Sequence, residues 1–388
     1  MRAPLALSIA AVALIACSDG DSASSPEPTP TQTASPTPTP TASTGGLPFN
    51  TAAVATFDSP WAMTFLPDQR MLVTQKAGQL LLVSADGRTK TPVGGIPSVD
   101  SAGQGGLMDV VLAPGFAQNK LVYFSASVAG SGGKGVVLWR GRLAESGSTA
   151  RLENVTELFR ATPFVSGDGH YSGRIAFAPD GQHLFFTNGE RQKFDPAQDP
   201  KATLGKVLRL TLDGKPAGDP GLTAKGFHPA VWSYGHRNLL GLAFDPAGNL
   251  WEQEMGPKGG DEVNLVLPGR NYGYPIVSDG DHYDGRDIPD HKTRPEFEAP
   301  KVSWNPSISP GGLIVYTGDV FPQWKGDLFI GGLSSQALIR VDVNGTSATK
   351  GDQFPMGQRI REVEQGPDGA IWVLEDGSQG RLLKLTAK

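Results

Sequence analysis

The feature that most constrains the fold is a hairpin-like unit that occurs six times along the chain. In one of them, the apolar runs Ile175–Ala178 and Leu184–Thr187 flank a Pro-Asp-Gly turn at Pro179–Gly181. Two apolar runs around such a turn predict two antiparallel strands. The other five units are Trp61–Gln75, Leu107–Ser125, Leu240–Gly256, Gly312–Gly332 and Ile360–Gly377.

A third apolar run follows each unit, directly or after an insertion. These runs are Leu80–Val83, Val136–Leu143, Val207–Leu212, Val263–Leu267, Ala337–Val343 and Leu382–Thr386. A repeated meander of three or four strands is typical of a propeller blade, and a closed ring of blades leaves only short edges. The sequence therefore predicts an all-β fold, a six-bladed β-propeller of four-stranded antiparallel blades. A β-sandwich or a solenoid is the alternative.

The first 17 residues predict a lipoprotein-type signal peptide. Leu5–Ile15 is apolar but too short for a membrane-spanning stop-transfer helix. The segment from Leu14 to Cys17 resembles the lipobox of bacterial lipoproteins, which implies that Cys17 becomes the lipidated first residue. In the alternative, this is an ordinary signal peptide and Cys17 is incidental.

Residues 18–46 predict a disordered linker rich in Pro, Thr and Ser, because such a segment has almost nothing to bury. Residues 47–388 predict the propeller domain. We expect an exported protein that is lipid-anchored at Cys17, on the periplasmic face of the bacterial envelope, at the outer membrane, or on the cell surface. The lipid would be its only membrane attachment. Cys17 is the single cysteine, which excludes an intrachain disulfide.

The composition bears on the class of ligand. The chain has 34 Lys and Arg against 39 Asp and Glu, a net charge of −5, with no basic runs. This balance argues against nucleic acid as a partner. The 50 glycines and 32 prolines suit a turn-rich all-β fold, and no long segment with helical periodicity predicts a sizeable helix.

The candidate catalytic and binding residues lie at one end of the predicted strands. His170 precedes the first strand of its hairpin and Glu190 follows the second, so the two residues should be neighbours. A carboxylate beside an imidazole orients the ring and raises its basicity, which suits a general base.

Equivalent positions in the other units should converge on one funnel. Three arginines there, Arg237, Arg359 and Arg361, favour a ligand with several negative charges. Arg359 and Arg361 lie two positions apart in a predicted strand and should share one face. In the alternative, each arginine pairs with a nearby acid such as Glu362 or Glu375.

The segment from Glu254 to Tyr272 is the best metal candidate. Backbone carbonyls at Gly256 and Pro257, with the carboxylates of Asp261 and Glu262, are oxygen ligands of the kind that calcium prefers. The sequence has no His/Cys cluster of the kind that binds zinc. His236, next to Arg237, is open to either interpretation, surface residue or ligand.

Several ordered motifs together resemble a known family. They are Gly169-His170 with Ser172-Gly173-Arg174, Tyr234-Gly235-His236-Arg237-Asn238, Gly256-Pro257 with Gly260-Asp261-Glu262, Asn271-Tyr272-Gly273, and Arg359-Ile360-Arg361. From Pro60 to Lys388 the chain resembles the soluble quinoprotein aldose (glucose) sugar dehydrogenases, and within them the bacterial aldose sugar dehydrogenases. The family uses pyrroloquinoline quinone (PQQ) and calcium on a six-bladed propeller.

The resemblance implies a role for each matching residue. His170 would take the proton of the sugar's anomeric hydroxyl, Glu190 would hold His170, and Arg237 would polarise the quinone carbonyl that receives hydride. The cofactor would be held by Gln104, Arg237, Asn238, Tyr283, Gly332, Leu333, Ser334, Arg359 and Arg361. Calcium would be bound by the carbonyls of Gly256 and Pro257, and a second calcium by Glu262 and Tyr272.

The chain also departs from the family pattern. Leu239-Leu240 stands where Pro-Gln is common, Met255 replaces a histidine, and Ser334 replaces a lysine found in some members, which removes one cation from the cofactor site. None of these changes touches His170.

The resemblance implies oxidation of an aldose to a lactone, with electrons passing to a soluble or membrane acceptor, a quinone or a cytochrome. The alternatives are a calcium-dependent propeller lactonase and a non-enzymatic cell-surface propeller that binds sugars. The sequence indicates neither the preferred sugar nor the oligomeric state.

Overall fold

The computed structural model describes residues 46–388, and these residues form an all-β fold. Their only α-helix is α1 (Phe116–Asn119), and the four 3₁₀ segments are η1 (Asp195–Ala197), η2 (Thr223–Lys225), η3 (His291–Thr293) and η4 (Pro322–Trp324). No helix within residues 46–388 is long and apolar enough to cross a bilayer. The predicted signal peptide, Cys17 and nearly all of the predicted linker lie outside the described residues.

Four sheets have four strands each, and neighbouring strands are antiparallel. The first consists of β10 (Ser172–Phe177), β11 (His183–Asn188), β12 (Lys206–Thr211) and β13 (Val231–Tyr234), and the second of β14 (Leu239–Phe244), β15 (Leu250–Glu254), β17 (Asp261–Leu265) and β19 (Val302–Trp304). The third consists of β20 (Pro310–Val315), β21 (Leu328–Gly332), β22 (Ala337–Asn344) and β23 (Ser347–Pro355), and the fourth of β24 (Ile360–Gln365), β25 (Ile371–Glu375), β26 (Gly380–Ala387) and β1 (Phe49–Phe57).

A fifth sheet has eight strands. They are β2 (Pro60–Phe65), β3 (Met71–Gln75), β4 (Gln79–Val83), β5 (Lys90–Gly94), β6 (Leu107–Leu112), β7 (Leu121–Gly130), β8 (Gly133–Ser146) and β9 (Thr149–Arg160). Two antiparallel meanders meet in it at one short parallel pairing of β5 with β9, which joins Val93 to Ala150 and Gly94 to Arg151. A small sixth sheet pairs β16 (Lys258–Gly259) with β18 (Gly280–Asp281).

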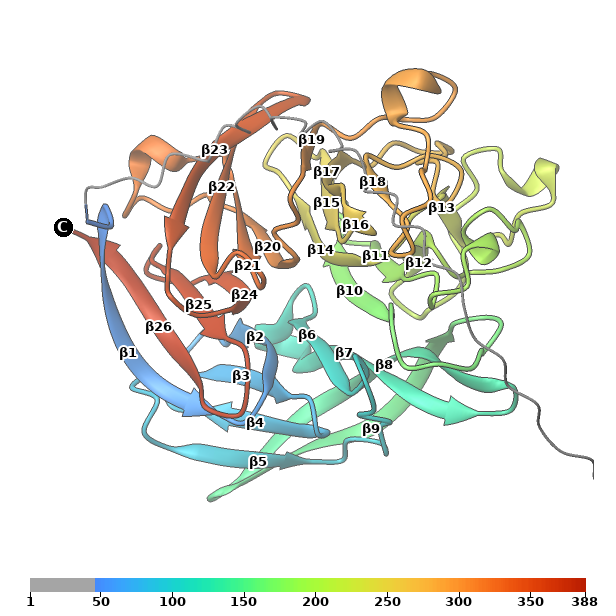
Figure 1. The fold of residues 1–388 in the computed structure, drawn as a ribbon. Helices are drawn as coiled ribbons and strands as arrows, with labels where there is room; N and C mark the ends of the chain where they lie inside the picture. Colours follow the sequence, from blue (N-terminus) through green and yellow to red (C-terminus); the bar gives the residue numbers. More distant parts are fainter. Residues whose placement is uncertain (1–45) are drawn as a thin grey trace, which may run out of the picture. The chain divides into compact units, whose positions relative to one another are not determined.

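The innermost strands close a ring. β2, β6, β10, β14, β20 and β24 contact one another in cyclic order around the centre of Figure 1. The sheets therefore form a β-propeller-like arrangement, and the predicted all-β class is confirmed. Each predicted hairpin and third run corresponds to observed strands.

The ring is closed by a strand that the repeat did not predict. β1, near the start of the described residues, pairs antiparallel with β26 from Phe49 opposite Ala387 to Phe57 opposite Gly380. The first and last strands of the domain thus share one sheet (Figure 1), and β1 covers the outer edge of β26.

All six inner hairpins carry a register shift within the first residues of the inner strand. Examples are the shifts between Ser172 and Ile175 in β10 and between Ile360 and Glu362 in β24. The other four inner pairings show the same irregularity at the same end. Bulges of this kind re-aim side chains and are common beside active sites.

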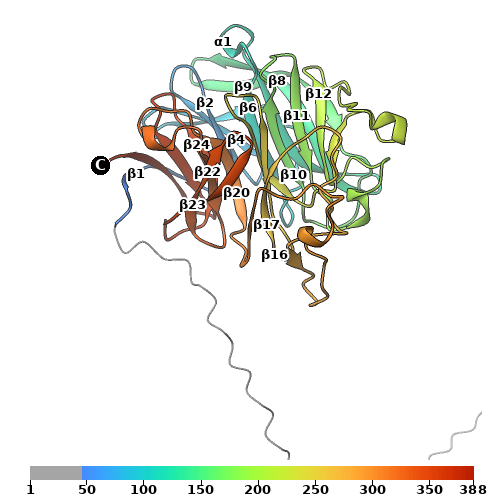
Figure 2. The ribbon, with the colours of Figure 1, turned by 90° about the horizontal axis from the view of Figure 1, so that it is seen from above.

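The two ends of the ring differ in structure. α1 lies in the turn between β6 and β7, whereas β16 lies at the opposite end in Figure 2. Between the ends, Arg174 of β10 ties inner strands together. Its Nη2 lies 2.6 Å from Glu362 Oε2 of β24, its Nε donates to the Leu240 carbonyl at 2.6 Å, and its guanidinium stacks on Trp61 at 4.2 Å.

Candidate active site

His170 and Glu190 meet at the end of the hairpin formed by β10 and β11. The Nδ1 atom of His170 is hydrogen-bonded to Oε1 of Glu190, and both side chains are buried. The structure thus brings together the two residues that the hairpin geometry predicts as neighbours. Because Nδ1 is engaged, Nε2 is the ring nitrogen left to exchange a proton with a ligand.

The carboxylate of Glu190 is held in place by backbone donors. It accepts the N–H groups of Gln192 at 2.9 Å, Lys193 at 2.5 Å and Phe194 at 2.7 Å. A carboxylate with this many fixed donors cannot rotate away from the imidazole. The His170 backbone N–H donates in turn to Gln104 Oε1 at 2.7 Å, which fixes the other partner.

The backbone around this pair adopts conformations that L-residues rarely use. His170 has φ 49° and Ser172 φ 61°, and Arg191, Gln192 and Phe194 have φ between 58° and 63°. Each such residue costs on the order of 1–3 kcal/mol and persists only where its surroundings impose it. The concentration of these residues at one place makes the pair a candidate functional site.

Arg191 imposes this conformation, and sequence reasoning missed it. Its guanidinium is buried, stacks on Tyr171 at 3.7 Å, and donates to the carbonyls of Gly169 at 2.8 Å, Lys134 at 2.6 Å and Gly167 at 2.5 Å. A guanidinium that binds three carbonyls fixes the course of the loop that ends at His170. The residue follows Glu190 directly, but an arginine in a polar loop carries no signal for this role.

The electrostatics favour a neutral imidazole. Burial lowers the pKa of His170, Glu190 opposes this effect, and the charge of Arg237 adds to it, so the net shift is downward. Burial acts to raise the pKa of Glu190, but the contact with His170 and the Phe194 N–H outweigh it and the pKa is lowered. At neutral pH the pair therefore consists of an ionised carboxylate and a neutral imidazole, the form a general base needs.

Beside this pair lies a cavity of about 450 Å³. Its lining comes from the starts of inner strands and the ends of second strands, as the repeat predicts. The lining residues are Ser59, Trp61, Lys76, Gly103, Gln104, Met108, Tyr171, Ser172, Asn238, Leu240, Met255, Ser309, Leu333, Arg359, Arg361, Asp376 and Gly377. Its volume is in the range of small-molecule sites.

The cavity carries an excess of positive charge. Arg359 and Arg361 both bind Asp376, through Nε of Arg359 at 2.8 Å and Nη2 of Arg361 at 3.0 Å. With Lys76, three cations face one carboxylate in the lining. The acids expected as partners, Glu362 and Glu375, instead bind Arg174 and Arg381. The alternative that these arginines pair with a nearby acid thus holds for Arg359 and Arg361, but the acid is Asp376, which directly follows β25, and neither Glu362 nor Glu375.

Arg237 and Asn238 lie in the loop before β14. The Arg237 guanidinium donates to the Met255 carbonyl at 2.8 Å, but its Nε is buried without a hydrogen-bond partner among the described residues. A buried donor without a partner fits an acceptor supplied by a ligand. Its guanidinium carbon also lies 6.0 Å from the ring of Tyr283, a residue with 75% of its surface exposed.

The predicted loop Gly332–Ser334 is only partly directed to the cavity. Leu333 lines it, and Gly332 is the buried last residue of β21. Ser334 is exposed and donates from Oγ to the Ser307 carbonyl at 3.2 Å, outside the lining. The serine thus supplies no contact that would replace a lysine at this position.

Four of the five predicted metal residues share a second, small cavity. Gly256, Pro257, Glu262 and Tyr272 line a space of about 10 Å³ together with Arg237 and Glu254. That volume is enough for a single water-sized species. Oxygen atoms from carbonyls and a carboxylate around such a space suit calcium.

The fifth residue, Asp261, is engaged elsewhere. Its carboxylate accepts the backbone N–H groups of Gly256 at 2.9 Å, Ile308 at 2.8 Å and Ser309 at 2.7 Å, and the hydroxyl of Ser307 at 2.5 Å. Through these hydrogen bonds, the Asp261 carboxylate links the turn at Gly256 to the loop before β20.

His291 is buried, and its Nε2 lies 3.4 Å from Glu262 Oε1. Burial acts to lower its pKa, but Glu262 outweighs that effect and the pKa of His291 is raised.

A propeller-like ring with a cation-rich cavity and a buried His–carboxylate pair at one end defines an enzyme site for an anionic ligand or cofactor. Comparison with known proteins identifies the family. Residues 57–384 match the model of the family described as glucose / sorbosone dehydrogenase. The chain belongs to this family, and the resemblance found in the sequence is confirmed.

The similar proteins are of the same kind. The chain is 40% identical over 339 residues to the aldose sugar dehydrogenase YliI of Escherichia coli, covering 85% of this chain and 91% of the relative. The apo-form crystal structure of the soluble aldose sugar dehydrogenase from E. coli has a TM-score of 0.81 at 38% identity, covering 88% of this chain and all of that one. The PQQ-bound aldose sugar dehydrogenase of Streptomyces coelicolor has a TM-score of 0.71 at 29% identity, covering 88% and 98%.

Proposed function

We propose that this protein oxidises aldose sugars at the anomeric carbon to the lactone, with PQQ and calcium. The observation that carries the proposal is the buried His170–Glu190 pair beside a cavity in which Lys76, Arg359 and Arg361 outnumber the single acid Asp376. Related proteins include an aldose sugar dehydrogenase and a PQQ-bound one.

The residues present fit PQQ. The cofactor carries several carboxylates, which Arg359 and Arg361 would hold through charge-assisted hydrogen bonds. Gln104 and Asn238 offer amides in the lining of the large cavity, and Arg237, which lines the small cavity, offers a buried Nε without a partner among the described residues. Bound PQQ would supply the acceptor for the hydride that leaves the sugar.

The protein's own groups handle the proton. Nε2 of His170 accepts the proton of the anomeric hydroxyl, and Glu190, held by three backbone N–H groups, stabilises the imidazolium that results. Burial, with the charge of Arg237 acting in the same direction, lowers the pKa of His170 and so keeps the resting imidazole ready to accept a proton. Electrons then leave to an external acceptor, a soluble or membrane quinone or cytochrome.

One calcium would be held by the carbonyls of Gly256 and Pro257 and a second by Glu262 and Tyr272, and all four residues line the small cavity. The positive charge of calcium would offset the buried carboxylate of Glu262, which lines the same space. These donors match the oxygen preference of calcium.

Two further expectations complete the proposal. We count the eight-stranded sheet as two blades divided at the short β5–β9 pairing, which gives six blades of four strands. We also propose that the protein is exported and anchored by lipid at Cys17, with residues 18–46 as a tether to the membrane surface.

The test is reconstitution of the metal-free, cofactor-free protein, followed by dye-linked oxidation of glucose and other aldoses. Activity should require both PQQ and calcium and should disappear when a chelator is added. The matched control for a substitution of His170 is His183→Ala, since His183 also binds a carboxylate, that of Asp180 at 2.7 Å, but on the surface of the protein. Sugar oxidation without PQQ, or none when PQQ is bound, would overturn the proposal.

A further inference from the structure

A second group of titratable side chains lies on one face of the sheet that contains β15 and β17. Glu252 and Glu254 occupy alternate positions of β15, so both side chains point to the same face. Register places Asn264 opposite Glu252 and Glu262 opposite Glu254, and all four residues are buried. Like charges directly opposite each other destabilise a sheet, so this face calls for positive charge.

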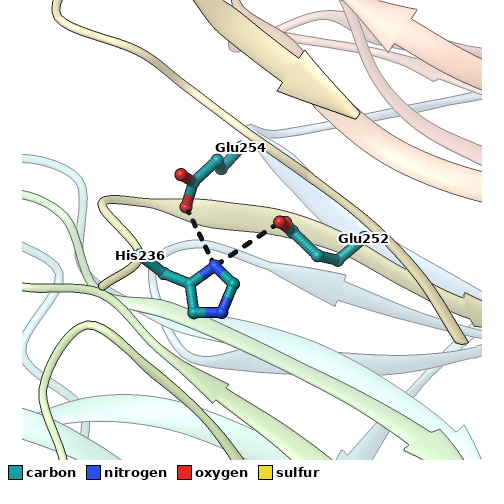
Figure 3. Close-up of side chains that lie close together, drawn as sticks. All are labelled: His236, Glu252 and Glu254. Atoms are coloured by element: carbon teal, nitrogen blue, oxygen red, sulfur yellow. Dashed lines mark ion pairs between the residues drawn. The ribbon is translucent and has the colours of Figure 1, made fainter. Parts of the chain in front are cut away.

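His236 completes the group from the loop after β13. Its ring stacks on Tyr272 with centroids 4.4 Å apart, and its Nε2 is hydrogen-bonded to Ser233 Oγ at 2.8 Å. Its Nδ1 faces the two carboxylates, 3.5 Å from Glu252 Oε1 and 3.7 Å from Glu254 Oε2 (Figure 3). The three residues come from two elements and converge on one point.

These separations suit ligands of a shared ion better than hydrogen bonds. A hydrogen bond of this kind spans about 2.7–3.2 Å, whereas two donors on one tetrahedral ion with bonds of about 2.0–2.2 Å lie about 3.3–3.6 Å apart. The donor atoms of His236, Glu252 and Glu254 all lie within 4.8 Å of one another. Nδ1 of His236 and Oε2 of Glu252 are buried and have no hydrogen-bond partner within residues 46–388.

The nearest protein cations are engaged elsewhere. The Nζ atom of Lys206 donates to three backbone carbonyls at 2.7–2.9 Å. The guanidinium of Arg237 donates to the Met255 carbonyl, and only its backbone N–H reaches Glu254, at 2.8 Å. Neither side chain donates a hydrogen bond to Glu252 or Glu254.

We propose that Nδ1 of His236 and the carboxylates of Glu252 and Glu254 bind one divalent transition-metal ion of the Zn²⁺ or Mn²⁺ class. An imidazole among carboxylates favours such an ion over calcium, which prefers oxygen ligands alone. The site has the outer partners typical of metal centres, since Ser233 fixes the far ring nitrogen and Asn264 Nδ2 donates to Glu252 Oε1 at 2.8 Å.

The ion would fasten a loop to a strand. His236 immediately precedes Arg237 and Asn238, both assigned to the cofactor site, whereas Glu252 and Glu254 belong to β15. The bound metal would therefore fix the base of the loop that presents Arg237. This inference rests on the buried cluster and is independent of the proposed sugar oxidation.

The test is metal binding by the full chain after chelator treatment and dialysis. Zn²⁺ and Mn²⁺ are titrated by calorimetry, bound metal is measured by mass spectrometry, and Co²⁺ serves as an absorbing probe. The wild type should bind one equivalent. Glu252→Gln and His236→Gln should lower the affinity by more than the roughly 10- to 100-fold expected for the outer-shell variant Ser233→Ala. Glu375→Gln, at a buried glutamate bound to Arg381, is the control and should bind as the wild type does.

Three results would overturn the proposal. The first is that the wild type binds none of the three metals, and the second is that it binds only calcium. The third is that the variants at positions 236 and 252 retain wild-type affinity. If those two variants fail to fold, Ser233→Ala carries the test, and unchanged affinity in that variant would also count against the site. Metal content does not depend on sugar turnover, so failure here and failure of the proposed activity are distinguishable.

Discussion

Replacing Glu190 by glutamine keeps the shape of the side chain but removes its negative charge and changes its hydrogen bonding. Oε1 of Glu190 contacts His170 Nδ1 and the Gln192 N–H, while Oε2 accepts the N–H groups of Lys193 and Phe194 at 2.5 and 2.7 Å. A glutamine has one acceptor oxygen and one donor amide. We expect the oxygen to stay on the two N–H groups at the Oε2 position, which turns the amide towards His170.

That orientation moves the proton of the neutral imidazole from one ring nitrogen to the other. The amide donates to Nδ1, so the neutral imidazole carries its proton on Nε2, the atom that must accept the proton of the sugar. Loss of a correctly protonated general base costs about 10²- to 10⁴-fold in rate. At about 1.4 kcal/mol per tenfold change, the activation barrier rises by about 3–5 kcal/mol.

The assay is dye-linked glucose oxidation by Glu190→Gln reconstituted with PQQ and calcium, with kcat/KM compared at pH 7. The control is Asp180→Asn, which alters a surface carboxylate bound to His183 Nδ1 at 2.7 Å and should leave the rate unchanged. A folded, PQQ-loaded Glu190→Gln protein with near-normal kcat/KM would refute the role of the pair.

Three further predictions follow from the same geometry. In Gly189→Ala, the new Cβ would lie 2.2 Å from the His170 carbonyl oxygen, so we expect the imidazole ring to shift and kcat for glucose oxidation to fall about 100-fold. The control is Gly94→Ala, whose new Cβ would have its nearest neighbouring atom at 3.7 Å and should leave kcat unchanged in the same assay. Arg361→Ala should weaken PQQ binding by about 2–4 kcal/mol in calorimetry without lowering the melting temperature, since Asp376 keeps its other arginine partner; an unaltered dissociation constant would count against the assignment. Because the pKa of His170 is lowered below 6.5, the neutral imidazole persists at neutral pH, and kcat/KM should fall only when the pH drops below 6.5. A pH profile of kcat/KM whose acidic limb has its midpoint above pH 7 would contradict this prediction.

The local parts of the fold could be predicted from the sequence. The runs Ile175–Ala178 and Leu184–Thr187 became β10 and β11 because short continuous apolar runs and a Pro-Asp-Gly turn act within a few residues. The neighbourhood of His170 and Glu190 followed from that hairpin alone.

The outer strands and the ring closure could not be predicted. β23, Ser347–Pro355, is largely exposed and polar, so it lacks the apolar run that marked the first three strands of each unit. β1 pairs with β26 across most of the chain length, and no local pattern encodes a partner so distant.

Charge partners depend on backbone irregularities that a strand pattern does not reveal. The register shift between Ile360 and Glu362 falls at Arg361, so strict alternation does not apply there, yet Arg359 and Arg361 both reach Asp376. The cluster of His236 with Glu252 and Glu254 escaped detection for a related reason. Its ligands are spread over two elements and form no compact motif.

The central claim is that His170 drives oxidation at the anomeric carbon by a cofactor bound in the cation-lined cavity. Anaerobic stopped-flow mixing of PQQ-loaded protein with glucose, and with glucose deuterated at the anomeric carbon, tests it most directly through the change in cofactor absorbance. We predict a single reduction phase that is slower with the deuterated sugar, and one slowed at least about 100-fold in His170→Ala although PQQ binding is retained. Reduction of His170→Ala at the wild-type rate, or no reduction of the wild type by any aldose, would contradict the account.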